Sequence, residues 1–338
     1  MRVRLAKAGM LQMRILFFLF VSVGQVHADG TDIQYKTYGS YTYCVEEGGT
    51  VKIVGYTGNE KVVNIPSEID GMPVRTIAGL GEYVSGDYKT YYVNDKTRKI
   101  IVPEGVVSIE SFNNGYVGGC MCVEEIILPD SVMEIDKEAF EYCEELKKIR
   151  LPSGLKEIKW GTFASCKSLK TIQLPNGLER IGASAFDCCY SLREIRIPDT
   201  VTSVGGSAFF CCKNLEKVTL SKNMTVIHKN TFAHCSKLKS IQIPKKVRTI
   251  GKRAFVNTAI TRVTIPENVT RIERLAFWSY KTKLKKVTIK STKLKEIGTE
   301  AFSPKNGAVY DVPDKCIKKY KKMLIKQKCF TKGKTKIK

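Results

Sequence analysis

The chain has 338 residues, of which 43% are apolar, and its 56 Lys and Arg against 33 Asp and Glu give a formal net charge of +23. The apolar fraction excludes a wholly disordered chain, and the presence of only three histidines argues against a site built from several imidazoles. The positive excess favours an anionic partner, whether nucleic acid, cell-wall polymer, anionic membrane or sulfated glycan.

The first 28 residues have the pattern of a secretory signal peptide. Four basic residues between Arg2 and Arg14 precede an apolar run over 15–23 and a small-x-small site that ends at Ala28. The run is shorter than the twenty or so residues that span a bilayer. Cleavage is therefore favoured over retention as a membrane anchor. We predict residues 1–28 as signal peptide, a secreted protein, and no integral membrane segment after cleavage.

Residues 29–62 are predicted to form an N-terminal β cap. Between Tyr41 and Val54, two alternating runs flank the segment 46–49, whose Glu-Glu-Gly-Gly sequence is typical of a hairpin turn. Stacked repeats need such caps, because the ends of their cores would otherwise face water.

A 23-residue repeat occupies residues 63–313. Phenylalanine recurs at Phe140, Phe163, Phe186, Phe209, Phe232 and Phe255, and continues less regularly at Phe277 and Phe302. Cysteine keeps the same interval at Cys120, Cys143, Cys166, Cys189, Cys212 and Cys235. Eight of the eleven prolines form a third column. Three independent columns in one register indicate a solenoid, with one repeat in each turn.

One repeat predicts one strand. Residues 146–151 alternate apolar and polar and end at Pro152, as in a short strand. Leu155, Ile158 and Phe163 follow at wider spacing, which favours a turn or a short 3₁₀ segment. Eleven such strand positions predict one parallel strand per turn and a solenoid roughly 50 Å long, at a strand spacing of about 4.8 Å.

Residues 314–338 are predicted to form a helical cap and a tail. After the last expected strand, over 310–313, Asp314 can cap a helix whose apolar residues share one face. Residues 315–338 carry eleven lysines and no acid. The end beyond Cys329 has little to pack and is expected to be mobile. We expect this cationic tail to hold the protein on an anionic cell wall.

The unit L-x-x-I-x-L-P-x-x-L-x-x-I-x-x-x-A-F-x-x-C-x-x resembles the BspA-like bacterial leucine-rich repeat family over roughly residues 60–313, and residues 71–74 look like the family's first repeat. Ser221 and Lys290 depart from its proline column and Thr258 from its cysteine column. The resemblance implies a curved right-handed solenoid. Together with the repeats and the two caps, it leads us to predict an α/β-type leucine-rich repeat of about 11 turns, with short parallel strands on its concave face, a β-hairpin cap and a helical cap. It also implies extracellular placement and a binding role, often in adhesion, and does not imply catalysis.

The polar strand positions predict a binding face. In L-x-x-I-x-L, the apolar side chains point into the core and the intervening ones face outward. From Leu146 onward there are 21 such positions, of which eleven are basic and two acidic. The basic residues are Lys147, Lys148, Arg150, Lys170, Arg193, Arg196, Lys217, Lys239, Arg262, Lys285 and Lys286. They predict polyanion binding on the concave sheet. The alternative is that exposed strand positions take lysine only for solubility and against edge pairing.

The same positions narrow the choice of partner. None of the 21 is aromatic, so bases have nothing to stack on, and nucleic acid is disfavoured. The predicted partner is an extracellular protein, such as a host matrix or mucin protein, or an anionic glycan or cell-wall polymer. The competing interpretation is a structural wall component that acts as a spacer without a specific ligand.

Twelve cysteines in an exported chain would ordinarily suggest disulfides. Half of them occupy the repeat column, where a small apolar side chain fits between turns, so buried thiols are favoured there. Cys188 and Cys211 form a second stacked pair. Cys316 and Cys329 flank the terminal helix and are the pair predicted to form a disulfide. No CxxC spacing supports a zinc site.

No motif points to catalysis. HExxH, the GxSxG elbow, the Walker loop and the dinucleotide glycine fingerprint do not occur. His228 and His234 are interpreted as structural, and nothing places carboxylates such as Glu124 and Glu125 in a cleft. We predict a protein that is not an enzyme and uses no cofactor or metal.

Overall fold

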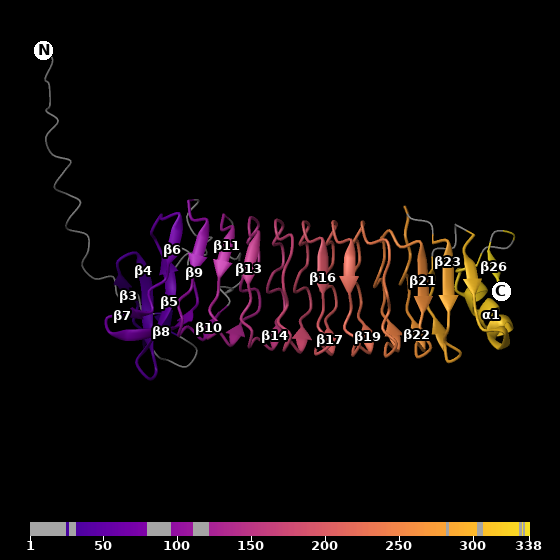
Figure 1. Ribbon diagram of the computed structural model, residues 1–338, viewed down its shortest axis with the longest axis horizontal. Coiled ribbons are helices and arrows are strands. Elements are labelled where there is room, and N and C mark those ends of the chain that lie inside the picture. The colour runs from indigo at the N-terminus through magenta and orange to yellow at the C-terminus, as the bar shows by residue number, and fades with distance from the viewer. Residues whose placement is uncertain are drawn as a thin grey trace, which may run out of the picture.

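The computed structural model describes residues 25–26, 32–79, 96–110, 122–281, 284–302, 307–330, 333 and 335–338. Of the predicted signal peptide, only Gln25–Val26 (β1) is among these residues, and it pairs with Asp32–Ile33 (β2). Cys120 lies outside the described residues. Figure 1 shows the stacked turns side by side along a rod, with a hairpin region at one end and a helix at the other. The predicted solenoid is confirmed, and the row of turns is close to straight in this view.

The predicted strands form a parallel row along the rod, here called ladder 1. Its strands are β6 (Val62–Asn64), β9 (Lys99–Ile101), β11 (Glu125–Ile127), β13 (Lys148–Arg150), β16 (Glu194–Arg196), β18 (Lys217–Thr219), β21 (Arg262–Ile265), β23 (Lys286–Ile289) and β25 (Val309–Asp311). In-register pairs such as Ile126 with Ile149 place the aliphatic residues over one another. Nine of the eleven predicted positions are therefore strands.

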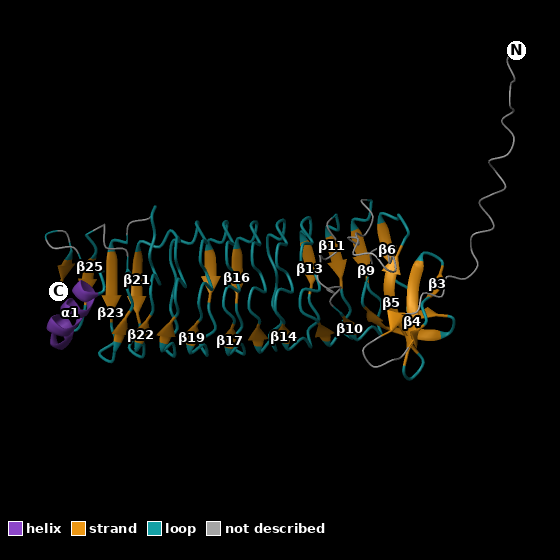
Figure 2. Ribbon diagram, turned by 180° about the vertical axis from the view of Figure 1, so that it is seen from behind, coloured by secondary structure: helices purple, strands orange, loops and turns teal. Residues whose placement is uncertain are grey.

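Each turn also carries a second, short strand that was not predicted: Ile158 lies in a strand, whereas Phe163 lies in a turn, as expected. These strands form ladder 2, which comprises β8 (Met72–Ile77), β10 (Ser108–Ile109), β12 (Glu134–Ile135), β14 (Glu157–Ile158), β15 (Arg180–Ile181), β17 (Ser203–Val204), β19 (Val226–Ile227), β20 (Thr249–Ile250), β22 (Arg271–Ile272) and β24 (Glu296–Ile297). Most are two residues long, too short for an alternating pattern to reveal. Figure 2 shows both rows of short strands joined by loops.

Ladder 1 is divided into three hydrogen-bonded sheets, β6 to β13, β16 with β18, and β21 onward. The two interruptions fall at residues 170–174 and 239–243, which are not strands. Both interrupted turns carry an Ile-Gln pair, Ile172-Gln173 and Ile241-Gln242, where the neighbouring strands have Arg or Thr in place of Gln.

The core repeats one packing arrangement. The rings of successive column phenylalanines stack with centroids 5.0–5.6 Å apart and interplanar angles of 1–17° from Phe140 to Phe302. The column thiols of Cys166, Cys189, Cys212 and Cys235 each donate a hydrogen bond of 3.2 Å to the carbonyl of the phenylalanine 26 residues earlier. Apolar stacking and a satisfied polar group thus fix the position of each turn on the one before.

The predicted hairpin cap is confirmed. Strand β4 (Tyr41–Glu46) pairs antiparallel with β5 (Thr50–Tyr56), and β3 (Lys36–Tyr38) adds to the outer side of β4. β5 then pairs in parallel with β8, so the cap continues ladder 2, and β7 (Glu68–Ile69) pairs with the other end of β8.

The C-terminal cap differs from the prediction in two details. Asp314 lies in a 3₁₀ turn, η2 (Asp314–Cys316), and makes no capping hydrogen bond to α1 (Ile317–Lys326). The end of the chain forms β26 (Lys336–Ile337), which pairs in parallel with β25, so β25 is not the last strand and the predicted mobile tail is wrong. Thr335 is buried and Ile337 half-buried, an alternation that the run of lysines concealed.

Replacement of Gly205 by alanine is expected to destabilise the stack. A Cβ at this position would lie 2.4 Å from the backbone nitrogen of Ala183 in the preceding turn, and that backbone cannot move aside cheaply. Overpacking of this kind costs about 1–3 kcal/mol. Chemical denaturation followed by circular dichroism measures the loss. The matched control is Gly154→Ala, whose Cβ would meet only the sulfur of Met133 at 3.7 Å; equal stability of the two variants would contradict the prediction.

Candidate binding face

The eleven predicted basic residues all lie at the surface of ladder 1 or its interrupted turns. Ten are exposed, and Lys286 is half-buried. The aliphatic residues that alternate with them are buried, as at Ile149 and Ile195. The geometry therefore gathers these cations on one side of each turn, repeated along the rod.

At the N-terminal part of this face, carboxylates neutralise the cations. Lys147 lies 2.9 Å from Glu124, and Lys148 lies 3.2 Å from Glu125. The hydrogen bond from Lys147 lowers the pKa of Glu124, and those from Lys99 and Lys148 lower the pKa of Glu125. Both carboxylates are thus held in the charged form, which suits an ion pair and not a general acid.

The remaining cations divide into two groups. Three are paired, Arg150 with Asp130 (2.6 Å), Lys217 with Glu194 (4.0 Å) and Lys286 with Asp311 (2.9 Å). Six make no ion pair with any residue that the structure describes, namely Lys170, Arg193, Arg196, Lys239, Arg262 and Lys285. These six lie between residues 170 and 285, so the uncompensated charge belongs to the middle and C-terminal part of the face.

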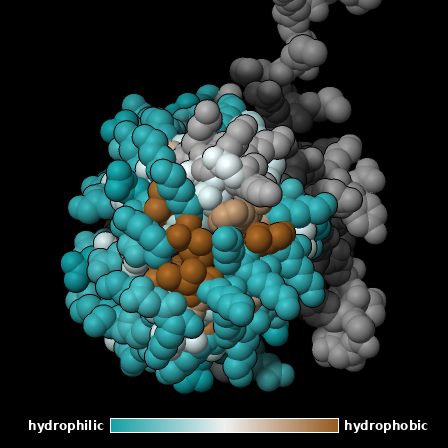
Figure 3. Space-filling view, turned by 90° about the vertical axis from the view of Figure 1, so that its right-hand side faces the viewer, coloured by the Kyte–Doolittle hydropathy of each residue, from teal (hydrophilic) through white to brown (hydrophobic). Residues whose placement is uncertain are grey.

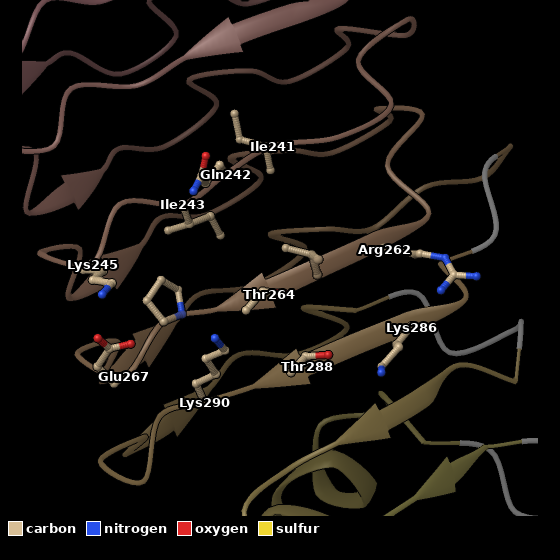
Figure 4. Close-up of a pocket in the computed structure, with 12 residues that line it drawn as sticks. Ile241, Gln242, Ile243, Lys245, Arg262, Thr264, Glu267, Lys286, Thr288 and Lys290 are labelled. Carbon is tan, nitrogen blue, oxygen red and sulfur yellow. The ribbon is translucent and has the colours of Figure 1, made fainter.

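A shallow hollow of about 490 Å³ opens on this part of the face, at the second interruption of ladder 1. Residues of three successive turns line it, beginning with Ile241, Gln242 and Ile243. Figure 4 shows Lys245, Glu267 and Lys290 toward one end of the hollow, and Arg262 and Lys286 toward the other. Four cations and one carboxylate thus surround a floor of aliphatic and threonine side chains.

Two of these cations were not among the predicted site residues. Lys245 follows a column proline, and Lys290 replaces one. The backbone N–H of Lys290 donates a 2.9 Å hydrogen bond to the carbonyl of Ile265, which a proline could not do. The departure at position 290 was visible in the sequence, but its place beside Arg262 and Lys286 depends on how the turns stack.

The described residues form no cluster typical of metal binding. No three His, Cys, Asp or Glu side chains there lie close enough to hold a metal ion. Burial, with Arg253 nearby, lowers the pKa of His234, whose ring packs edge-on against Phe210. Within the described ranges, no helix is long and apolar enough to cross a membrane.

No disulfide forms between the described cysteines. The predicted disulfide between Cys316 and Cys329 does not form in the structure, where both residues are buried. The Cys329 thiol instead donates to the carbonyl of Gln327 at 3.4 Å. Cys188 and Cys211 are half-buried neighbours, and burial raises the pKa of Cys188 to about 11.

Comparison with protein families gives one clear match. The family model described as BspA type leucine-rich repeat region (6 copies) matches residues 87–216, 161–283 and 206–332. Together these overlapping segments cover more than half of the chain. No curated protein matches the chain significantly.

Solved structures of bacterial leucine-rich repeat proteins resemble the chain. One from Bacteroides ovatus shares 27% identity, with a TM-score of 0.55 over 82% of this chain and 71% of that one. One from T. pallidum shares 26% identity, with a TM-score of 0.46 over 66% and 89%. A leucine-rich cell surface protein from Faecalibacterium prausnitzii shares 21% identity, with a TM-score of 0.32 over 82% and 94%. The first likeness supports the same fold.

Thiol alkylation should distinguish the buried column cysteines from the half-buried Cys188. In the native protein we expect Cys189, Cys212 and Cys235 to resist iodoacetamide, because burial raises the pKa of each thiol and keeps the reagent out. Cys188 should react slowly at neutral pH, and its rate should rise about tenfold for each unit by which the pH increases toward its raised pKa, because only the thiolate reacts. Peptide mass spectrometry without reductant measures the extent of labelling at each of these cysteines. Labelling of the column thiols before unfolding, or a peptide linked through Cys329, would contradict this assignment.

Proposed function

The chain belongs to the BspA-type leucine-rich repeat family, and from that premise we propose that it is a secreted or surface-held binding protein that takes an anionic macromolecule on ladder 1. Proteins built from this repeat typically act by binding, not by catalysis, and typically lie outside the cell or on its surface. The proposed ligand is an anionic glycan, a cell-wall polymer, or an acidic region of a host matrix or mucin protein.

The observation that supports this function most is the excess of unpaired cations around the hollow. Lys245, Arg262, Lys286 and Lys290 face a single carboxylate, that of Glu267. Lys286 is engaged by Asp311, but the other three cations make no ion pair with a described residue. Cations without an internal partner can bind an external anion without first breaking an ion pair.

The spacing of the turns favours a linear ligand over a compact one. Neighbouring strands of a ladder lie about 4.8 Å apart, so the unpaired cations are spread along the rod in steps of a few ångströms. A polymer with regularly placed sulfates, phosphates or carboxylates can contact several of them at once. Because the contacts are exposed, binding should weaken steeply as salt is added.

Binding should depend on the cations of the hollow and not on basic residues in general. We expect the variant Lys245→Ser, Arg262→Ser, Lys290→Ser to bind heparin about tenfold more weakly in 50 mM NaCl, since three exposed ion pairs at about 0.5 kcal/mol each sum to about 1.5 kcal/mol. Isothermal titration calorimetry at 50 and 500 mM NaCl gives the affinity and its salt dependence.

The matched control removes equally exposed but neutralised cations, as Lys147→Ser with Lys148→Ser. These lysines are held by Glu124 and Glu125, so their loss should leave the affinity within about twofold. Equal weakening by both variants would point to non-specific attraction to a basic protein. No binding of heparin, polyglutamate, wall polymer or mucin by the native protein would favour the alternative function, a structural spacer of the cell wall.

We further propose that the lysines of α1 and β26 help to retain the protein on an anionic wall. The described part of residues 315–338 has nine lysines and no acid. Retention by charge alone should be reversed by 1 M NaCl, because the screening length then falls to about 3 Å. Immunoblotting of the salt wash and of the cells measures it. Protein that stays with the cells after this wash would contradict electrostatic retention.

A further inference from the structure

We propose that the two ends of the solenoid are complementary surfaces, and that a second copy of the chain docks its N-terminal cap on the C-terminal cap of the first. The contact is head to tail and extends ladder 1 from one molecule into the next. It uses residues outside the hollow, so it stands independently of the polyanion site proposed there, although it shares the lysines of α1 with the proposed retention on the wall.

The C-terminal end has an apolar centre and a cationic rim. Figure 3 shows apolar surface in the middle of this end, with hydrophilic surface around it. The apolar side chains of the C-terminal segment that remain exposed or half-buried are Ile317, Met323, Ile325, Phe330 and Ile337, with Ile325 at 53% exposure. The described charged side chains over residues 315–338 are all lysines, and the exposed acid Asp314 precedes them. Such a patch is typical of an interaction site.

The N-terminal end carries the opposite charge. Residues 32–70 contain six acids against three bases, a net charge of −3. Glu47 and Glu68 are exposed. This end also exposes Tyr38 (47%) and Val62 (42%) beside a hollow of about 280 Å³ that lies between the hairpin cap and β6. Both ends therefore combine apolar side chains with charge, and the charges have opposite sign.

The strand edges fit the same arrangement. Among the described strands, β6 and β26 are the terminal members of ladder 1 at the two ends of the rod, and each pairs with one neighbour only. An unpaired edge presents backbone donors and acceptors for another strand. At the C-terminal end of ladder 2, by contrast, α1 packs against β24. Ladder 1 therefore ends in a strand with one pairing neighbour at each end of the rod, and all of its strands run parallel. At the N-terminal end the Tyr41 hydroxyl of the hairpin cap donates to the Asn64 carbonyl of β6, and β3 is a further strand with one neighbour.

A second copy fits the C-terminal end better than a soluble polyanion does. A hydrated polyanion would use the lysine rim but leave the apolar centre in water, whereas the acidic cap with Tyr38 and Val62 offers partners for both. The two surfaces differ, so the contact is heterologous. Repetition of a heterologous contact that does not close on itself gives a chain of molecules rather than a closed dimer.

Charge exchange at the two ends tests this arrangement. The N-end variant is Glu47→Lys with Glu68→Lys, and the C-end variant is Lys322→Glu with Lys326→Glu; all four positions are exposed. Sedimentation velocity from 1 to 200 μM in 50 mM NaCl measures association, and circular dichroism verifies the fold. We expect the native protein to form oligomers that 1 M NaCl weakens, and each variant alone to associate at least tenfold more weakly.

A mixture of the N-end variant and the C-end variant gives the decisive comparison with each variant alone. The two variants in equal amounts should associate again, because the two new glutamates at the C-end of one can then pair with the two new lysines at the N-end of the other. A chain that carries all four substitutions should associate with itself for the same reason. Ile325→Ser should weaken association with little change in its salt dependence. A native protein that stays monomeric at 200 μM would overturn the proposal. So would association that survives each charge exchange unchanged, or that only an added polyanion such as heparin induces.

Discussion

The whole structure depends on the register in which each turn sits on the one before. Phenylalanine rings stack at 5.0–5.6 Å, and the column thiols donate to carbonyl groups of the preceding turn. A shift of one residue would break both contacts at once and would turn the aliphatic strand residues toward water. The core therefore fixes not only that the chain forms a solenoid but also which side chains can reach its surface.

Because of this constraint, the positions that determine the fold differ from those that can determine binding. Positions such as 149 and 195 must stay aliphatic, whereas their neighbours on ladder 1 face solvent and can vary without changing the stack. Charge on that face can then be arranged along the rod. It is neutralised near Glu124 and Glu125 and left unpaired around Arg262. The interruption of ladder 1 at residues 239–243 places the hollow within the uncompensated part.

The structural features that recur with the 23-residue repeat could be predicted from the sequence. The solenoid, ladder 1 and the burial of column cysteines follow from residue types 23 positions apart, and the hairpin cap follows from the alternating runs on either side of residues 46–49. Ladder 2 was missed because strands such as Glu157–Ile158 are too short to show a period. β26 was missed because its lysines resemble a solvated tail. Ion pairs such as Arg150 with Asp130 join residues 20 apart, so the neutralised and free cations could not be distinguished without the stacked turns.

Hydrogen–deuterium exchange with and without heparin tests the central claim most directly, because it locates the ligand on the native chain without any substitution. We expect added protection in peptides that cover residues 239–246, 262–267 and 285–290, and little change over residues 147–150, where acidic partners already hold the cations. Protection centred on residues 147–150, or confined to residues 315–338, would contradict a binding face at the second interruption of ladder 1.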